Sequence, residues 1–472
     1  MEATSVAEMS SFGEQHFGGC DLGDKRLTNR VVSTANSFLE HPGGTLPDKL
    51  NRNADLIGFY RLANNPKVTH EKLMAAHCAR TRELMGDVAG VVLVIHDTTE
   101  LDFSGLDSVA DLGSIGHGGD GACRGYLCHN SLAYDYQAAE VLGLAAQTLH
   151  VRRQVPKGES PKAKREHPQR ESRLWKKGFS ALGPAPAQGL RVNVCDRGAD
   201  LFEFIEAVER AKDHYVIRSK SNRNIEISDG RGGVIRTKLH DYARGLPTLG
   251  TRTVQVQSNQ GVQGRRATVR VAAGPVSLQA PHFARGEHSQ ENIDTFVVHV
   301  REVKPPQEAE ALEWTLLTNV PAVDWASACE RVDWYGRRPI IEEYHKAQKT
   351  GCGIEQPQFT TGHALRVAIA ILSVVATQLL RLRDLSRRED AKTRPASAVV
   401  DREYVEALSL WRFRTVCAEM SVHDFCRALA KLGGHLNRAQ DRAPGWLVLW
   451  RGWTKLQLLV EGARGARFRR CV

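Results

Sequence analysis

Five polar side chains in residues 335–349 follow a helical repeat. Tyr335, Arg338, Glu342, His345 and Lys349 are separated by steps of three, four, three and four residues. Because residues three and four apart share one face of a helix, this spacing predicts a carboxylate with cations before and after it. Arginine can grip a phosphate through two hydrogen bonds, and lysine offers a point charge. The other interpretation is an exposed helix whose charges pair with one another.

Two more carboxylates follow apolar runs earlier in the chain. Asp97 ends the stretch 90–97, and Asp196 follows residues 190–195. Both stretches are rich in β-branched residues, which is typical of strands buried on both faces. An aspartate in this position can also simply begin a loop or cap a helix.

Together Asp97, Asp196 and Glu342 fit one kind of chemistry. Crowded carboxylates raise one another's pKa, so they gather where a cation compensates for the repulsion. Oxygen ligands suit Mg²⁺ or Mn²⁺. Two such ions can activate a water and stabilise the leaving oxygen of an in-line phosphoryl transfer. We therefore predict that these three residues are the metal ligands and the catalytic residues, with Arg338, Lys346 and Lys349 contacting phosphate.

The elements that must position these side chains can be predicted from local pattern. Proline suits the first helical position, so a helix is expected to begin at Pro339 and to end at Gly351 and Gly353. Asp24 is expected to cap a helix. Two further helices are predicted, one at 54–62 and one that begins near 69 and runs past 84. The pattern predicts a hairpin from residues 126–134 and 140–151, and two more strands at 190–195 and 215–218. Asp200 is predicted to begin a helix.

Three regions follow from these elements. Residues 1–70 are helical, and residues 71–362 form an α/β region whose segment 225–303 is expected to be an inserted β subdomain. Residues 363–472 are helical and rich in arginine. Residues 152–173 are rich in proline and charge and predict a loop or linker. The apolar run 367–380 is too short to span a membrane and predicts a buried helix.

Composition limits the class of partner. The 472 residues are 42% hydrophobic, as expected for a globular protein, and carry a net charge of +10. This charge favours a polyanion, with nucleic acid ahead of a membrane surface. The ten cysteines are scattered without a zinc-ligand pattern and suit a reducing cytosol. The polar N-terminus predicts no signal peptide.

The spaced residues Tyr335, Arg338, Glu342 and Lys349 resemble the signature of the insertion-sequence-four family of DNA transposases. Residues 95–99 and 194–200, around Asp97 and Asp196, resemble the family's first two acidic motifs, and 22–24 and 59–61 resemble its end-recognition domain. The similarity continues to 444–446 and 452–453. It implies an α/β fold with a ribonuclease-H-like catalytic core, an inserted β subdomain, and helical N- and C-terminal domains. At two positions a relative in this family has tryptophan where this chain has another residue, Pro339 and Gln348.

The resemblance also implies an activity, a cut-and-paste transposase that nicks its element's ends, forms and resolves a hairpin, and transfers the strand into target DNA. Its partners would be double-stranded DNA and a second copy in a homodimer, with two Mg²⁺ ions (Mn²⁺ substituting) and no membrane, in a bacterial cytoplasm. Alternatives are a structure-selective endonuclease of the same fold and a non-catalytic DNA-binding inhibitor of transposition. The residues implied to contact DNA are Tyr335, Arg338, Lys346, Lys349, Trp314, Arg218, Arg26, Arg30 and Arg61.

Trp314 and the N-terminal arginines each have a second interpretation. Trp314 lies 21 residues before Tyr335 and matches a tryptophan that stacks on a flipped base in the family, but its expected place is just before a strand, where a lone tryptophan is more often a core residue. Arg218 matches a basic position near the family's active site. Arg26, Arg30 and Arg61, with Lys25, could equally form a solvated helix face.

Overall fold

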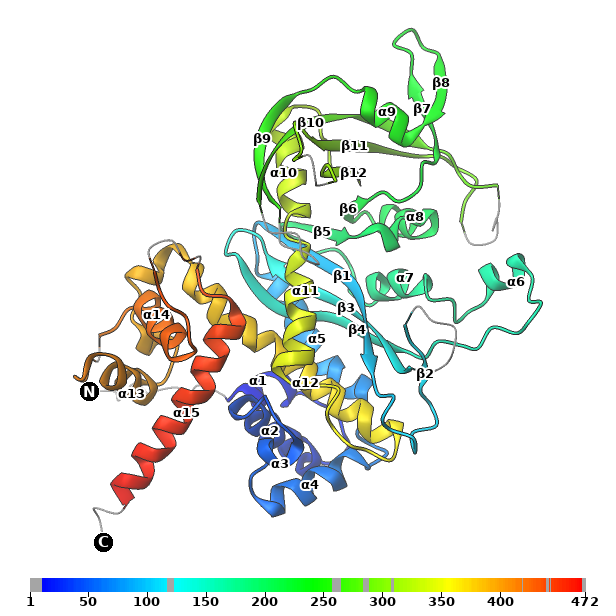
Figure 1. Cartoon of the computed structure of the whole chain (residues 1–472). Helices are drawn as coiled ribbons and strands as arrows, with labels where there is room; N and C mark the ends of the chain where they lie inside the picture. The colour runs from blue at the N-terminus through cyan, green and yellow to red at the C-terminus, as the bar shows by residue number, and fades with distance from the viewer. Residues whose placement is uncertain are drawn as a thin grey trace, which may run out of the picture.

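The computed structural model describes residues 11–116, 123–256, 265–282, 288–306, 310–417, 419–438, 441 and 443–468. Its centre is one twelve-stranded mixed sheet, flanked by helices on both faces (Figure 1). The strands are β1 Val91–Asp102, β2 Gly113–Ser114, β3 Arg124–Asp135, β4 Glu140–His150, β5 Leu190–Cys195, β6 His214–Arg218, β7 Asn224–Ser228, β8 Val234–Lys238, β9 Gly250–Val256, β10 Arg265–Leu278, β11 Ile293–Glu302 and β12 Glu313–Thr318.

The helices cover the sheet and form the two ends of the chain. They are α1 Phe12–Phe17, α2 Lys25–Glu40, α3 Leu46–Lys49, α4 Asn53–Ala63, α5 His70–Gly86, α6 Pro161–Glu166, α7 Arg173–Ser180, α8 Phe202–Arg210, α9 Leu239–Gly245, α10 Trp325–Tyr335, α11 Pro339–Lys346, α12 Gly362–Arg387, α13 Arg402–Phe413, α14 Val422–Leu432 and α15 Trp446–Phe468. In Figure 1, α1–α4 and α13–α15 lie toward the end of the molecule away from β7–β11.

Strand β1 lies between an antiparallel and a parallel neighbour. It pairs with β3 in antiparallel fashion and with β5 in parallel fashion, β4 extends the meander beyond β3, and β6 lies parallel to β5. One face packs on α7 and α8 and the other on α5, α11 and α12. Parallel strands need both faces covered, which explains the nearly continuous apolar sequence of β1 and β5.

The predicted β insertion is rich in strands, but it does not form a sheet of its own. Strand β12 pairs with β6 on one side and with β11 on the other, and β10, β7 and β8 follow outward. The insertion therefore continues the central sheet, because the chain returns through β12 before it enters α10.

The N-terminal helices agree with the prediction. Asp24 caps α2 by accepting the Arg26 N–H at 2.9 Å, and Thr69 caps α5. The apolar run 367–380 lies in α12. Among the described residues, α12 is long and apolar enough to cross a membrane by length and composition, but 82% of its apolar window is buried in the protein, as in a core helix.

Three local predictions were wrong. Residues 152–173 contain a short helix, α6, capped by Ser160. Asp200 does not begin α8, which follows Leu201; its carboxylate instead accepts the N–H groups of Lys220 and Ser221 at 2.7 and 2.8 Å. Trp314 lies inside β12 instead of ahead of a strand.

The predicted helix start at Pro339 is confirmed. Pro339 occupies the first position of α11, where no N–H is needed. A π-helical turn, Ala347–Gly351, follows α11 directly, and Gly353 has a φ of +59°, a conformation that favours glycine. The two glycines thus end the helical segment.

Candidate active site and DNA-binding region

One guanidinium brings the three predicted carboxylates together. Arg338 Nη2 lies 2.7 Å from Asp97 Oδ2 and 3.6 Å from Asp196 Oδ2, and Arg338 Nη1 donates to Glu342 Oε1. The three residues come from two strands and a helix far apart in sequence. The structure therefore places all three at one point, with Arg338 as their shared cation.

The sheet explains why the two aspartates are neighbours. The parallel ladder between β1 and β5 ends with His96 opposite Cys195, so the next residues are neighbours: Asp97, which is still in β1, and Asp196, which directly follows β5. Contrary to the sequence prediction, β1 does not end at Asp97; it continues to Asp102 by pairing with β3. Alternation places Asp97 on the face of Ile95, which is the face covered by α11.

The other two carboxylates are held by local structure. Asp196 precedes a 3₁₀ turn, Arg197–Ala199, and accepts the Gly198 N–H at 2.7 Å. Glu342 lies in the first turn of α11, where the helix dipole favours a negative charge. The side chains of Asp97, Asp196 and Glu342 are 15%, 34% and 55% exposed, so the site opens from Asp97 outward.

Burial perturbs the innermost carboxylate. The pKa of Asp97 is raised to about 6, chiefly by burial; the Arg338 guanidinium opposes this shift, and the charges of Asp196 and Glu342 add to it. A carboxyl group with this pKa is partly protonated near neutral pH. Full ionisation of Asp97 near neutral pH therefore needs a cation in addition to Arg338.

The donor types fit a divalent metal, but the arrangement is not that of a closed metal site. Carboxylate oxygens are the ligands that Mg²⁺ and Mn²⁺ prefer. Within the part of the chain that the structure describes, no three His, Cys, Asp or Glu side chains form a group that could hold a metal ion. The guanidinium of Arg338 occupies the position between the carboxylates, so shared coordination of an ion by all three requires Arg338 to move.

Three of the predicted DNA-contacting residues lie together beside this site. The rings of Trp314 and Tyr335 meet edge to face with centroids 5.2 Å apart, and Tyr335 is buried. Burial raises the pKa of Tyr335, whose hydroxyl also interacts with Arg218. Arg218 donates to the Glu313 carbonyl at 3.1 Å. Trp314 is half-buried and packs on the core, so it is partly a core residue.

The cations after Glu342 have different surroundings. Lys346 is exposed on α11, whereas Lys349 pairs with Glu355 at 3.2 Å. Gln348 is fully buried and donates to the Ser373 hydroxyl of α12 at 3.0 Å. Gln348 therefore packs in the core. The position at which this chain has glutamine instead of the relative's tryptophan is thus buried.

The sequence pattern placed His345 on the helix face of Arg338 and Glu342 but did not indicate its contacts in the site. Its Nδ1 lies 4.0 Å from Asp97 Oδ2, and its Nε2 lies 3.1 Å from the amide nitrogen of Asn130. Burial lowers the pKa of His345 to about 3, helped by the charges of Arg338 and Lys349, so the imidazole is neutral. The link depends on Asn130 in β3, and no local pattern around residue 345 indicates it.

A basic cavity of about 500 Å³ opens beside Asp196. Its lining includes Arg218, which was predicted, and three further cations that were not, Arg197, Lys220 and Arg244, together with His240, whose pKa burial lowers. Arg244 pairs with Glu313 at 2.9 Å, which lowers the pKa of Glu313 to about 2. The cavity could have been inferred only from the convergence of β6, α9 and β12.

The predicted N-terminal arginines lie on two neighbouring helices. Arg26 and Arg30 belong to α2 and Arg61 to α4, and all three are exposed. Arg26 pairs with Asp24 at 3.2 Å and Arg30 with Asp55 at 3.4 Å. They are available to a surface partner, although two of them share their charge with a carboxylate.

A comparison with known families identifies this helical region. Residues 9–68 match the family described as transposase DNA-binding. The match spans α1–α4 and includes the three arginines. The N-terminal part of the chain is therefore a DNA-binding region of the transposase type, and DNA is a partner of the protein.

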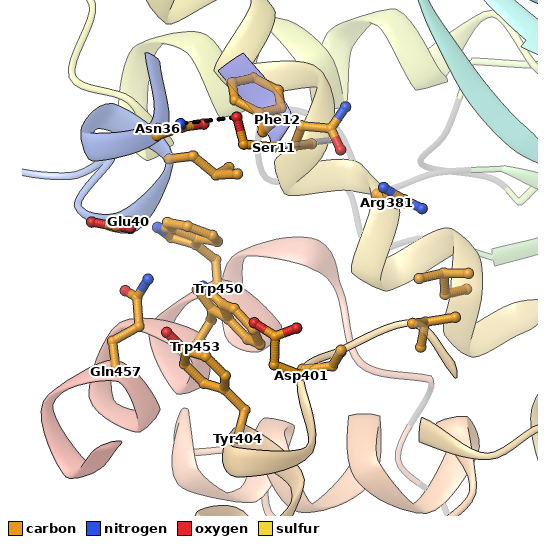
Figure 2. Close-up of a pocket in the computed structure, with 15 residues that line it drawn as sticks. Ser11, Phe12, Asn36, Glu40, Arg381, Asp401, Tyr404, Trp450, Trp453 and Gln457 are labelled. Atoms are coloured by element: carbon orange, nitrogen blue, oxygen red, sulfur yellow. Dashed lines mark hydrogen bonds between the residues drawn. The ribbon is translucent and has the colours of Figure 1, made fainter. Parts of the chain in front are cut away.

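The DNA-binding region packs against the C-terminal helices around a second cavity, of about 470 Å³ (Figure 2). Asn36 and Glu40 of α2 face Tyr404 of α13 and Trp450 and Trp453 of α15. The rings of Tyr404 and Trp453 stack with centroids 5.0 Å apart. Helices α2, α13 and α15 thus line one cavity.

Proposed function

We propose that the protein is a cut-and-paste DNA transposase that nicks the ends of its element, frees the element through a hairpin and joins it to target DNA. The observation that carries the proposal is the convergence of Asp97, Asp196 and Glu342 on one cation. The transposase DNA-binding region at residues 9–68 would bind the DNA that is cut.

The sheet supports a ribonuclease-H-like core. Strands β4, β3 and β1 form an antiparallel meander, and β5 and β6 follow in parallel to β1. This order is the one expected of such a core, with the two aspartates on its central strands. Strands β7–β11 would then be the insertion that precedes the third acidic residue.

The proposed cofactor is a pair of Mg²⁺ ions, with Mn²⁺ able to substitute, held by Asp97, Asp196 and Glu342. When bound, the ions supply a more acidic water and stabilise the leaving oxygen of a phosphoryl transfer. Arg338 would turn from the carboxylates to a DNA phosphate, a ligand that its fork of donors fits equally well. Lys346 and Lys349 would hold neighbouring phosphates, and a homodimer would bring two ends together.

Variants at the three carboxylates test the proposal. We predict that Asp97→Asn, Asp196→Asn and Glu342→Gln each abolish cleavage of end DNA in Mg²⁺ but leave end binding nearly unchanged, since the residues hold metal instead of DNA. Cleavage on denaturing gels and binding by gel shift are measured together, on DNA from either side of the gene. Asp87→Asn, at the exposed end of α5, is the control. Near-normal cutting by one variant removes that residue from the site.

A second assay separates the transposase from its alternatives. Precut ends are supplied with target DNA and Mg²⁺, and joined products are counted. A transposase joins the 3′ ends to the target, a structure-selective endonuclease cuts without joining, and a DNA-binding inhibitor does neither. Absence of joining by a protein that cuts would overturn the proposal in favour of the endonuclease.

A further inference from the structure

A row of hydrogen bonds crosses the sheet and ends beside Asp97. His70 Nε2 of α5 lies 3.0 Å from Gln147 Oε1 of β4, and Gln147 Nε2 donates to Asn130 Oδ1 of β3 at 2.7 Å. Asn130 Nδ2 lies 3.1 Å from His345 Nε2. His345 Nδ1 in turn lies 4.0 Å from Asp97 Oδ2.

The row has a direction, and a backbone carbonyl sets it. The carbonyl of Cys128 can only accept, and it lies 3.4 Å from Asn130 Nδ2, so this side of the amide carries the donor. The opposite side, Oδ1, accepts from Gln147. Asn130 therefore donates to His345 Nε2. A ring nitrogen that accepts has no proton, so the proton of His345 is on Nδ1, the atom that faces Asp97.

The strands place these groups in register. Asn130 is directly opposite Asp97 in the ladder of β1 and β3, and Gln147 is directly opposite Asn130 in that of β3 and β4. Asn130 is fully buried, and His70 and His345 nearly so. A buried amide without hydrogen-bond partners costs about 1–3 kcal/mol of folding stability. A row in which each member is paired therefore strongly favours one arrangement of donors and acceptors.

We propose that Asn130 and Gln147 are positioning residues that set the tautomer of His345, so that its Nδ1–H faces Asp97 and orients that carboxylate toward the bound cation. The inference rests on the proposed function of Asp97 as a metal ligand. Outer partners of metal ligands commonly act in this way, and their loss costs about 10–100-fold in metal affinity or activity. A purely structural row would stabilise the fold without affecting the metal.

Substitutions that reverse a donor distinguish the two cases. Asn130→Asp has nearly the same shape but can no longer donate, so His345 must donate from Nε2 and turn a lone pair toward Asp97. Gln147→Glu replaces the donor to Asn130 Oδ1 by a carboxylate, which repels that oxygen and favours an Asn130 amide turned over against the Cys128 carbonyl, so that it donates to residue 147 instead of His345; the position is half-buried, where a carboxylate is better tolerated. His345→Gln should function, because an amide can accept from Asn130 and donate toward Asp97, whereas His345→Leu can do neither.

A matched control is available in Gln348→Met. Gln348 is also a buried amide, one turn away, but its hydrogen bonds go to Ser373 and to the Cys128 thiol instead of to Asp97, Asn130 or His345. It reports the effect of losing a buried amide hydrogen bond that does not lead to the site. All variants are compared with the wild-type chain by thermal unfolding.

The primary measurement is Mn²⁺ affinity by calorimetry in the presence of end DNA. We expect Asn130→Asp, Gln147→Glu and His345→Leu to bind Mn²⁺ about tenfold or more weakly, with His345→Gln and Gln348→Met close to wild type. If folded Gln147→Glu and His345→Leu proteins bind Mn²⁺ within twofold of wild type, the positioning function is wrong.

The tautomer itself is read independently by ¹⁵N NMR of histidine-labelled protein. The inference requires an Nδ1–H form of His345 in the wild type, and an Nε2–H signal would overturn it whatever the activity. If the Nδ1–H form is present but the protein neither binds Mn²⁺ nor cuts DNA, the proposed function fails while the tautomer assignment stands. Loss of the Nδ1–H form in Gln147→Glu supports the direction of the row.

Discussion

At the scale of single residues, Trp314 offers a test of the hairpin step of the proposed reaction. A base that blocks the hairpin must leave the stack, and stacking on an aromatic ring returns about 1–3 kcal/mol. Trp314 is half-buried against Tyr335, beside the carboxylates but without contact to them. We predict that Trp314→Ala nicks end DNA at nearly the wild-type rate and forms hairpins about 5–150-fold more slowly.

Denaturing gels that separate nicked from hairpin ends measure both steps, and Trp314→Phe, which keeps an aromatic face, serves as the control. Because Trp314 also packs on the core, melting temperatures must be compared before the rates are interpreted. Hairpins formed by Trp314→Ala at the wild-type rate would leave Trp314 as a core residue alone.

Residue types and spacing predicted much of the site. Two apolar runs predicted the first two carboxylates, Asp97 and Asp196, and the helical spacing of residues 335–349 predicted Glu342. The structure brings all three to the guanidinium of Arg338. The pairing of Arg338 with all three was not predictable, because a sequence pattern does not show which of several partners a cation selects. The row through Asn130 and His345 was missed for a similar reason, since its members pair only through strand register.

At the scale of elements, two histidines connect the DNA-binding region to the sheet. His77 of α5 accepts the Leu144 N–H of β4 at 3.0 Å, and its Nδ1 lies 3.0 Å from Nδ1 of His16 in α1. Both rings are buried, and burial lowers the pKa of His16 to about 3 and also lowers that of His77. The contact therefore depends on both rings being neutral.

Mild acid should weaken this connection. Because the folded pKa of His16 is below its unfolded value of 6.5, its contribution is fully present above pH 6.5 and is lost as the pH falls toward 3. Each pH unit in this range removes about 1.4 kcal/mol from the free energy of unfolding. We therefore predict that between pH 6.5 and 5 the wild type loses about 2 kcal/mol more of its unfolding free energy than His16→Gln. Urea unfolding at the two pH values measures it, and an equal loss in both proteins would contradict it.

The elements themselves were predictable where their signals are local. The apolar run 190–195 became β5 with those bounds, and Pro339 began α11. Strand β1 continued past Asp97 because Thr98–Asp102 pairs with β3, which its polar sequence does not indicate. The insertion joined the central sheet because β12 pairs with β6, and pairing between distant strands leaves no local pattern.

At the scale of the whole molecule, the net charge of +10 should appear in the salt dependence of DNA binding. Each neutralised phosphate contributes about −0.9 to the slope of log K against log salt. We predict a steep slope, reduced by about 2 in the double variant Arg26→Ala, Arg61→Ala. The control is Lys212→Ala, an exposed lysine just beyond the C-terminal end of α8. Gel shifts from low to high salt measure it, and a slope near zero would show that the positive charge does not contact DNA.

The guanidinium between the carboxylates also has a consequence for heat stability. Since Arg338 supplies a positive charge to Asp97, Asp196 and Glu342 together, we expect the free protein to keep its fold without a metal. We predict that a chelator leaves the melting temperature of the wild type unchanged within about a degree. In Arg338→Ala the partly buried carboxylates lose their counter-charge, so the melting temperature should fall and then rise with added Mg²⁺, by about 2.7 kcal/mol of stability at a hundredfold excess over Kd.

Differential scanning fluorimetry with and without chelator measures both effects. A wild-type protein that melts several degrees earlier in chelator would show that Arg338 does not replace the metal. With Arg338 as an internal substitute cation, the chain could fold before it meets a metal, and under the proposed function it would cut DNA only after Arg338 has moved from the carboxylates to a phosphate.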